Sequence, residues 1–168
     1  MRDDDGAVRA AALDALQRVG RLDADVIAEV ATDPHVAVRR RAAELAARHP
    51  DVDLLVFLDD DDPTVIEIAA WSCGEHESGR DPIVARLIEL ADHDDALVRE
   101  SAVAALGAIG DPRAVPTIIA AATEDKPAVR RRAVLALAPF EGDDVDAAIA
   151  SALEDRDWQV RQSAEELA

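Results

Sequence analysis

The chain has 168 residues, about half of them apolar, yet it holds only two Phe, two Trp and no Tyr. A core rich in alanine and leucine and poor in aromatic residues suits closely packed helices and excludes an ordinary β-sandwich. The net charge of −18 arises from 24 Asp and 12 Glu against 17 Arg and one Lys. This charge argues against a nucleic-acid groove, which needs a basic stripe. No apolar run is long enough to cross a bilayer.

The first residues and the cysteine content indicate where in the cell the protein is expected. The acidic first residues contain no apolar segment of a secretory signal, and one cysteine cannot form an internal disulfide. We therefore expect a cytoplasmic protein. The excess of Asp over Glu, with a single Lys, resembles the proteins of extreme halophiles, so we expect a source such as a halophilic archaeon. Molar salt shortens charge attraction to about 3 Å, which leaves shape and apolar contact to select partners.

Six octets with one shared pattern open the first type of predicted helix, at residues 2–9, 32–39, 59–66, 92–99, 123–130 and 154–161. Their seventh residue is always Val, and their eighth is Arg except at Ile66. Alanine follows three residues later and an apolar residue seven later, which traces one face of a helix. The Asp residues supply N-caps. The pattern predicts Val-Arg helices that start near residues 7, 36, 64, 96, 127 and 158.

Five shorter apolar segments alternate with these helices, at residues 23–31, 51–58, 81–91, 111–122 and 143–153. Several open with Asp-Pro or Asp-Asp, which is a cap followed by a compatible first turn. The chain is therefore predicted to form about eleven helices in one domain over 1–168, with about five and a half repeats. A two-helix unit is too small to bury its own apolar face, so neighbouring repeats must stack.

This pattern is similar to the HEAT repeat, in the short form of about 30 residues named after phycobilisome lyases. The stretch "DDALVRESAVAALGAIGDPRAVPTIIAAA" at residues 94–122 carries the resemblance most clearly. The resemblance implies an all-α protein, a right-handed α-α superhelix with the Val-Arg helices along its concave wall. It does not select one function, because the family contains scaffolds, adaptors, lyase subunits, hydroxylases and DNA glycosylases.

The stretch "WSCGEHESG" at residues 71–79 is the one place where a metal site could be assembled. In the repeat alignment Cys73 takes a column of Leu and Ala, and His76 takes an apolar column, so both are expected in the core. His49 occupies the column of His76 one repeat earlier, which leaves His49, Cys73 and His76 open as an alternative zinc or iron site. No CxxC or HxxxH spacing supports that site, and we predict no metal and no cofactor.

A comparison with the known metal enzyme of this fold leads to the same expectation. Deoxyhypusine hydroxylase carries His-Glu pairs near the Val-Arg position of its inner helices. Here the only such pair, His76-Glu77, lies at the end of a predicted helix. We therefore do not expect an enzyme.

The Arg column raises the question of an anion-binding ladder. Because a guanidinium forms bidentate pairs, we expect these side chains instead to bind Asp carboxylates and backbone carbonyls in the turns between repeats. The predicted structural ladder consists of Arg9, Arg39, Arg99, Arg130 and Arg161.

A partner surface is predicted on the concave wall, at positions one, five and nine after the Arg column. Its middle is apolar, and charges surround it, which is the usual anatomy of a binding patch. Tryptophan is a frequent hot-spot residue, although Trp71 could also pack across repeats and Leu135 could simply favour the helix. The predicted partner-binding residues are Trp71, Ala104, Leu135, Glu67, Glu100 and Arg131, with Ala108 and Pro139 beside them.

The function predicted from these features is a non-enzymatic scaffold or adaptor that binds a helix or extended segment of another protein. The alternative is a chromophore-lyase-like or metal-dependent enzyme subunit, and nucleic-acid binding through the arginines is less favoured. Because the chain begins and ends with a Val-Arg helix, a terminal helix could also join two copies.

Overall fold

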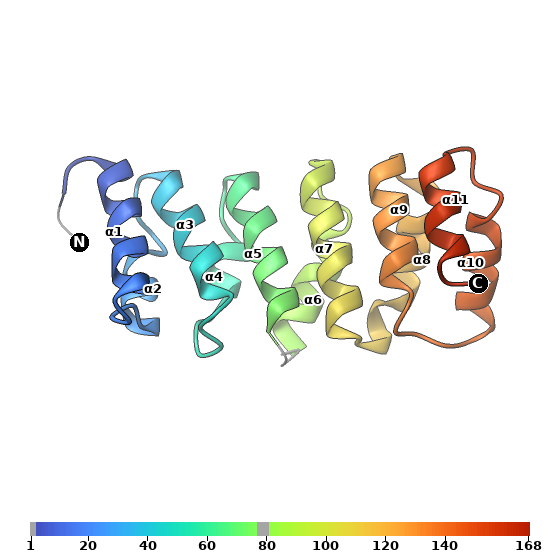
Figure 1. The fold of residues 1–168 in the computed structure, drawn as a ribbon, viewed down its shortest axis with the longest axis horizontal. Helices are drawn as coiled ribbons and strands as arrows, with labels where there is room; N and C mark the ends of the chain where they lie inside the picture. Colours follow the sequence, from blue (N-terminus) through green and yellow to red (C-terminus); the bar gives the residue numbers. More distant parts are fainter. Residues whose placement is uncertain (1–2, 77–80) are drawn as a thin grey trace.

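The computed structural model describes residues 3–76 and 81–168, and over these residues the protein is all-helical. The described residues form eleven α-helices. Figure 1 shows that they follow one another in a row, with the two ends of the chain at opposite ends of the row. The odd-numbered helices are α1 (Gly6–Arg18), α3 (Val36–Ala46), α5 (Pro63–Glu75), α7 (Ala96–Ile109), α9 (Pro127–Ala136) and α11 (Trp158–Glu165). The even-numbered helices are α2 (Ala24–Val30), α4 (Leu55–Leu58), α6 (Asp81–Leu90), α8 (Val115–Glu124) and α10 (Asp143–Ala152).

The octets act as helix starts because their Asp side chains accept backbone N–H groups that have no partner within the helix. The carboxylates of Asp62, Asp95 and Asp157 accept from the residue two positions on, at 2.8–2.9 Å. The odd-numbered helices consequently begin within one residue of the positions that the octets predict. α7 ends at Gly110, which adopts the left-handed conformation with φ of 71° that glycine tolerates.

Two of the even-numbered segments differ from the sequence expectation. The predicted helix 51–58 shrinks to the single turn of α4, because this repeat is shortened and Asp53 accepts the N–H of Leu55 to start the turn late. The predicted helix 111–122 begins instead as a 3₁₀-helix, η1 (Pro112–Ala114), which runs directly into α8. Pro116 has no N–H to donate to the Pro112 carbonyl, so the regular α-helical bond at this point cannot form, and Val115 donates to that carbonyl instead.

The odd-numbered helices form one layer, since each packs against the next along the row. The even-numbered helices form a second layer that packs against the first. The apolar columns of the repeat meet between the layers: the Val column from Val38 to Val160 and the Ala column from Ala42 to Ala164 are fully buried. Val8 is the exception at 48% exposure, because no described helix covers that side of α1. We call the outer surface of the odd layer the odd-helix face.

α7 and α9 approach each other closely at Gly107. A Cβ atom added to Gly107 would stand 2.6 Å from Cβ and 2.7 Å from Cα of Ala136. Only a glycine permits this spacing, so the residue fixes how tightly the two helices can stack. None of the described helices is both long and apolar enough to cross a membrane.

Candidate functional site

The arginines of the column form a ladder along the edge where the odd-numbered helices begin. Arg9 donates from Nε and Nη2 to both carboxylate oxygens of Asp33, at 2.8 and 2.7 Å, and from Nη1 to the Asp3 carbonyl at 2.6 Å. Arg39 makes the same three bonds to Asp60 and to the Asp33 carbonyl. Each rung therefore joins a helix start to the turn of the next repeat, as a bidentate guanidinium pair is suited to do.

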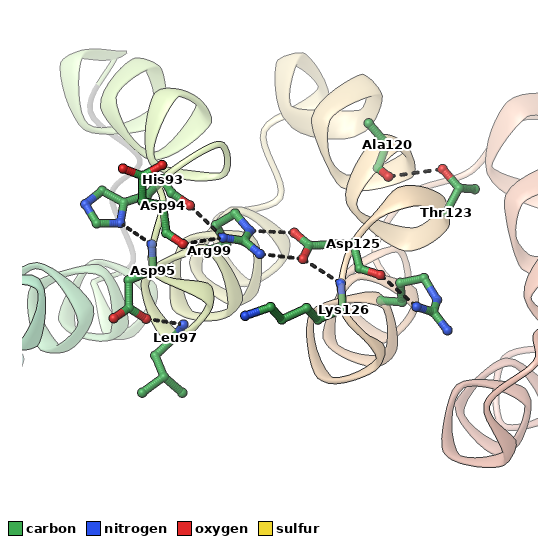
Figure 2. A network of polar contacts seen from close by, with 10 residues as sticks. His93, Asp94, Asp95, Leu97, Arg99, Ala120, Thr123, Asp125 and Lys126 are labelled. Carbon is green, nitrogen blue, oxygen red and sulfur yellow. Dashed lines mark hydrogen bonds and ion pairs between the residues drawn. The ribbon is translucent and has the colours of Figure 1, made fainter.

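Figure 2 shows the rung at Arg99 in detail. Nε and Nη2 of Arg99 each donate to an oxygen of Asp125 at 2.6 Å, and Nη1 donates to the His93 carbonyl at 2.7 Å. Arg130 continues the ladder to Asp155 and to the Asp125 carbonyl, with only 1% of its surface exposed. Arg161 ends it with one bond, to the Asp155 carbonyl at 2.7 Å. The ladder is thus a structural element with its donors directed into the turns.

The ladder lacks one arginine–aspartate pair, and both residues that would form this pair are replaced. Ile66 stands where the other octets have Arg, and it is buried. The next repeat carries His93 at the octet position that holds Asp33, Asp60 and Asp155 elsewhere. The His93 ring accepts the N–H of Asp95 at 3.0 Å, so it keeps the capping role of the lost carboxylate. An unpaired buried carboxylate is costly, which explains why the two changes occur together.

The ladder lowers the pKa of the Asp side chains that it binds. Hydrogen bonds from Arg9, Arg99 and Arg130 hold the pKa of Asp33, Asp125 and Asp155 below the ordinary Asp value. At Asp60, burial acts to raise the pKa, and the bonds from Arg39 and a backbone N–H outweigh it. These carboxylates are therefore charged at neutral pH, and the ladder arginines pair with them inside the fold.

Four of the predicted wall residues meet in one open groove between α7 and α9. Its lining consists of Ala104, Gly107, Ala108, Arg132, Leu135, Ala136, Ala138 and Pro139, and its volume is about 500 Å³. Small residues on both helices leave this space, since alanine and glycine cannot fill the gap between two helix backbones. Arg132 is the only charged residue in the lining.

Charged wall residues stand near this groove. Glu100 forms an ion pair with Arg132, with 3.6 Å between its carboxylate and Nε, and Glu67 accepts a hydrogen bond from the Ser101 hydroxyl at 3.4 Å. Arg131 is half-buried and makes no ion pair with any residue that the structure describes. The polar rim is therefore loosely paired, in contrast to the tight ladder.

Trp71 lies in different surroundings from those expected. It is 44% exposed, but it lines a separate hollow of about 260 Å³ with Asp14, Arg18, Arg41, Glu44 and Arg48 of α1, α3 and the turn that follows. The predicted apolar centre is therefore divided in two: an apolar groove on α7 and α9, and a charged hollow beside Trp71. Octet columns place residues on a face, but they do not show which neighbours share a hollow.

A further hollow, larger than the α7–α9 groove, lies between α6 and α8 on the even layer, where no site is predicted from the sequence. It has a volume of about 1020 Å³, with Ile88, Ala91, Ala120 and Ala121 on its walls. Its rim mixes Asp92, Asp94 and Glu124 with Lys126 and Arg156, so it presents no single charge. Small residues at facing positions of two successive even-numbered helices were the signal that could have found it.

His49, Cys73 and His76, the residues of the alternative metal site, each have different surroundings in the structure. His76 is buried and donates from Nε2 to the Ala46 carbonyl at 2.9 Å, while His49 bonds the Gln17 amide oxygen at 3.0 Å. Burial, with a smaller effect of Asp53, raises the pKa of the Cys73 thiol to about 12. Over residues 3–76 and 81–168, no group of three His, Cys, Asp or Glu side chains could hold a metal ion. Glu77, of the His-Glu pair, lies outside the described residues.

The ends of the row also present apolar side chains. Val8 on α1 is 48% exposed and Trp158 at the start of α11 is 62% exposed. Contact between copies through a terminal helix stays a prediction.

These features define an α-helical repeat solenoid, and solved structures share its fold. An engineered protein matches at 22% identity with a TM-score of 0.68, over 98% of this chain and 92% of its own. The Escherichia coli protein YibA matches at 19% identity with a TM-score of 0.64, over 99% of this chain and 63% of its own. A designed armadillo repeat protein, solved in complex with peptide (KR)4, matches at 16% identity with a TM-score of 0.65, over 91% and 82%.

The family is identified from the sequence itself. The model for HEAT repeats matches residues 52–138 and 84–168, which together cover more than half of the chain. The chain belongs to the HEAT-repeat family. A search of curated proteins finds no match.

Proposed function

We propose that this protein is a non-enzymatic adaptor that binds a segment of another protein on its odd-helix face, in the groove between α7 and α9. The observation that carries the proposal is the groove itself: an open, apolar space of about 500 Å³ on the surface of a very acidic protein. Its volume falls within the range of ligand sites, and its apolar walls are typical of them. A helix or extended segment laid across stacked helices is a recurring mode of recognition.

The comparisons support this use of the fold. The designed armadillo repeat protein with a similar stack of helices is solved with a bound peptide. The described histidines and the single cysteine form structural contacts, and the hollow between α6 and α8 has a rim of mixed charge, so the apolar groove best fits an apolar segment of a partner. The alternative, a chromophore-lyase-like or metal-dependent enzyme subunit, finds no such observation in its favour.

The proposal is tested by selecting binders from a random-peptide display library on immobilised protein. We expect selected peptides to bind the wild type and to lose at least about tenfold in affinity on Leu135→Asp, which places a charge in the apolar groove. The matched control is Ala150→Asp, at an exposed position of α10 on the even layer. Peptides that bind all three proteins equally, or no enriched peptides, would contradict the proposal, provided that both variants melt like the wild type.

The proposal also covers the repeat subtype, the source and the location of the protein. We place the protein in the short, phycobilisome-lyase-like branch of HEAT repeats and in the cytoplasm of a halophilic archaeon. The support is the repeat length of about 30 residues and the acidity, with Asp twice as frequent as Glu and a single Lys. In concentrated salt a short-range apolar groove is a more effective recognition device than long-range charge.

A further inference from the structure

We infer that the segment bound in the α7–α9 groove carries a carboxylate next to an aliphatic side chain, so that the partner is an apolar and acidic stretch of another protein. This inference rests on the proposed function, because it names the chemistry of the partner at the same site. It follows from how charge is distributed around the groove.

Acidic residues are kept out of the groove although they are abundant in the chain. The protein has 36 Asp and Glu among 168 residues, yet none lines the groove. The even-numbered helices carry eight acidic residues against one arginine. On the odd-numbered helices, with the five ladder arginines set aside, five arginines stand against six acidic residues, so the charge is near balance. The acidic excess therefore lies mainly on the even layer and in the turns.

α9, which forms one wall of the groove, is cationic. It contains Arg130, Arg131 and Arg132 and no acidic residue. Arg130 is buried in the ladder, where Asp155 and the Asp125 carbonyl satisfy it. Arg131 and Arg132 remain on the surface, and Arg132 enters the lining of the groove.

The guanidinium of Arg132 has N–H groups that can bind a partner. Its side chain is 41% exposed, and its one ion pair, with Glu100, spans 3.6 Å, longer than a charge-assisted hydrogen bond. A carboxylate of the partner can bind this guanidinium through two hydrogen bonds. A lysine or arginine of the partner would meet no carboxylate in the groove and would lie against a like charge, which lowers affinity.

The overall charge of −18 does not oppose this binding at short range. The Debye length is about 8 Å at 0.15 M salt and about 3 Å at 1 M, so in either medium a segment seated in the groove responds mainly to the nearest charges. Arg132 is the charged residue in the lining, Glu100 stands 3.6 Å from its Nε, and Arg131 is the next residue of α9. The acidic residues of the even layer lie on the other side of the odd-numbered helices. The apolar contact comes from Ala104, Ala108, Leu135 and Pro139, which receive an aliphatic side chain.

The test compares three synthetic peptides of about 14 residues by fluorescence anisotropy. All three have leucine at helical spacing, and the positions between are Glu, Gln or Lys. We expect the Glu peptide to bind about three- to tenfold more tightly than the Gln peptide, and the Lys peptide to bind most weakly, because a partly exposed ion pair is worth at most about one decade in affinity.

Two variants tie the preference to α9. The double variant Arg131→Gln/Arg132→Gln is expected to bind the Glu and Gln peptides equally, and Glu100→Gln, which frees Arg132, is expected to bind the Glu peptide about twofold to threefold more tightly. Arg86→Gln, on α6 of the even layer, is the matched control and is expected to behave like the wild type. A merely structural role of Arg132 would not change the ranking of the peptides.

The outcomes separate this inference from the proposed function. If the Lys peptide binds as tightly as the Glu peptide and both are lost on Leu135→Asp, the partner chemistry is wrong and the adaptor function stands. If the double variant keeps the preference for Glu, the carboxylate lies elsewhere and the inference is overturned. If none of the peptides binds the wild type, the inference and the proposed function are both contradicted.

Discussion

Four of the five ladder arginines bind two carboxylate oxygens and a carbonyl, because the octet presents these acceptors at fixed positions in two consecutive turns. Arg161, the last, binds one carbonyl. The carboxylate comes from the following repeat, and the carbonyl comes from the residue six positions before Arg9, Arg39 or Arg99. Most of the carboxylates also accept the backbone N–H two positions on, as Asp155 does from Asp157 at 2.7 Å. One side chain therefore caps a helix start and locks the spacing of two repeats.

The residue-scale prediction concerns Arg130, the most buried rung. Arg130→Met would leave the Asp155 carboxylate without its partner, so we expect it to lower the free energy of unfolding by about 2–4 kcal/mol at pH 7. Urea denaturation would measure the change. Arg131→Met, one position along the chain and without an ion pair to described residues, should stay within about 0.5 kcal/mol of the wild type. Equal effects of the two variants would contradict the ladder's role.

The same pair predicts a pH dependence. Arg130 lowers the folded-state pKa of Asp155 below its unfolded value, so the stability that this pair contributes is present above that unfolded value, about pH 4. It is lost as the pH falls through the lower, folded-state pKa. The difference in stability between wild type and Arg130→Met should therefore be constant from pH 7 to 5 and shrink below about pH 4. A difference that grows on acidification would have the wrong sign.

Helices of this fold are defined by columns, and the columns could be read from the sequence. The Val and Ala columns become the core between layers, and the Asp-rich octets become capped starts. What could not be read is the distance between helices of different repeats. That distance depends on glycine and alanine contacts such as Gly107 against Ala136. Ala104 and Leu135 share one groove, as their columns predict, while Trp71 lines a different hollow with residues of α1 and α3.

The element-scale prediction concerns the α7–α9 contact. Gly107→Ala improves helix propensity by about 1 kcal/mol, but its Cβ would meet Ala136 at 2.6–2.8 Å, including backbone atoms that cannot turn away. We expect the strain to win and the variant to lose about 1–3 kcal/mol of stability. Gly74→Ala, whose Cβ would stand 3.3 Å from the nearest atom, should remain within about 1 kcal/mol of the wild type in the same thermal melts. A more stable Gly107→Ala protein would show that α7 and α9 pack less tightly.

At the scale of the whole molecule, packing and net charge have opposite effects on stability. The ladder and the apolar columns hold the row of helices together, while the net charge of −18 opposes its compactness. The all-helical solenoid was predictable because six copies of one pattern agree with one another, which is strong support for a repeat. The hollow between α6 and α8 lies outside the Val-Arg columns, which describe only the odd-numbered helices, and its one signal in the sequence is the small residues on α6 and α8.

The whole-molecule prediction concerns salt. Raising KCl from 0.1 M to 1 M shortens the Debye length from about 10 Å to about 3 Å, which screens repulsion among the exposed carboxylates. The buried ladder pairs are screened much less, so the net effect is stabilising. We expect the melting temperature to rise steadily with KCl. A melting temperature that is unchanged or falls over this range would contradict the proposed adaptation to high salt.

The central claim is that a partner docks in the groove between α7 and α9, and the most direct measurement is an NMR titration of the isotope-labelled protein with the Glu peptide. We expect backbone amide shifts to change at residues 104–108 and 132–138 and to stay unchanged at Ala91, Ala120 and Ala121 of the other hollow. Shift changes centred on α6 and α8, or spread evenly over the chain, would contradict it.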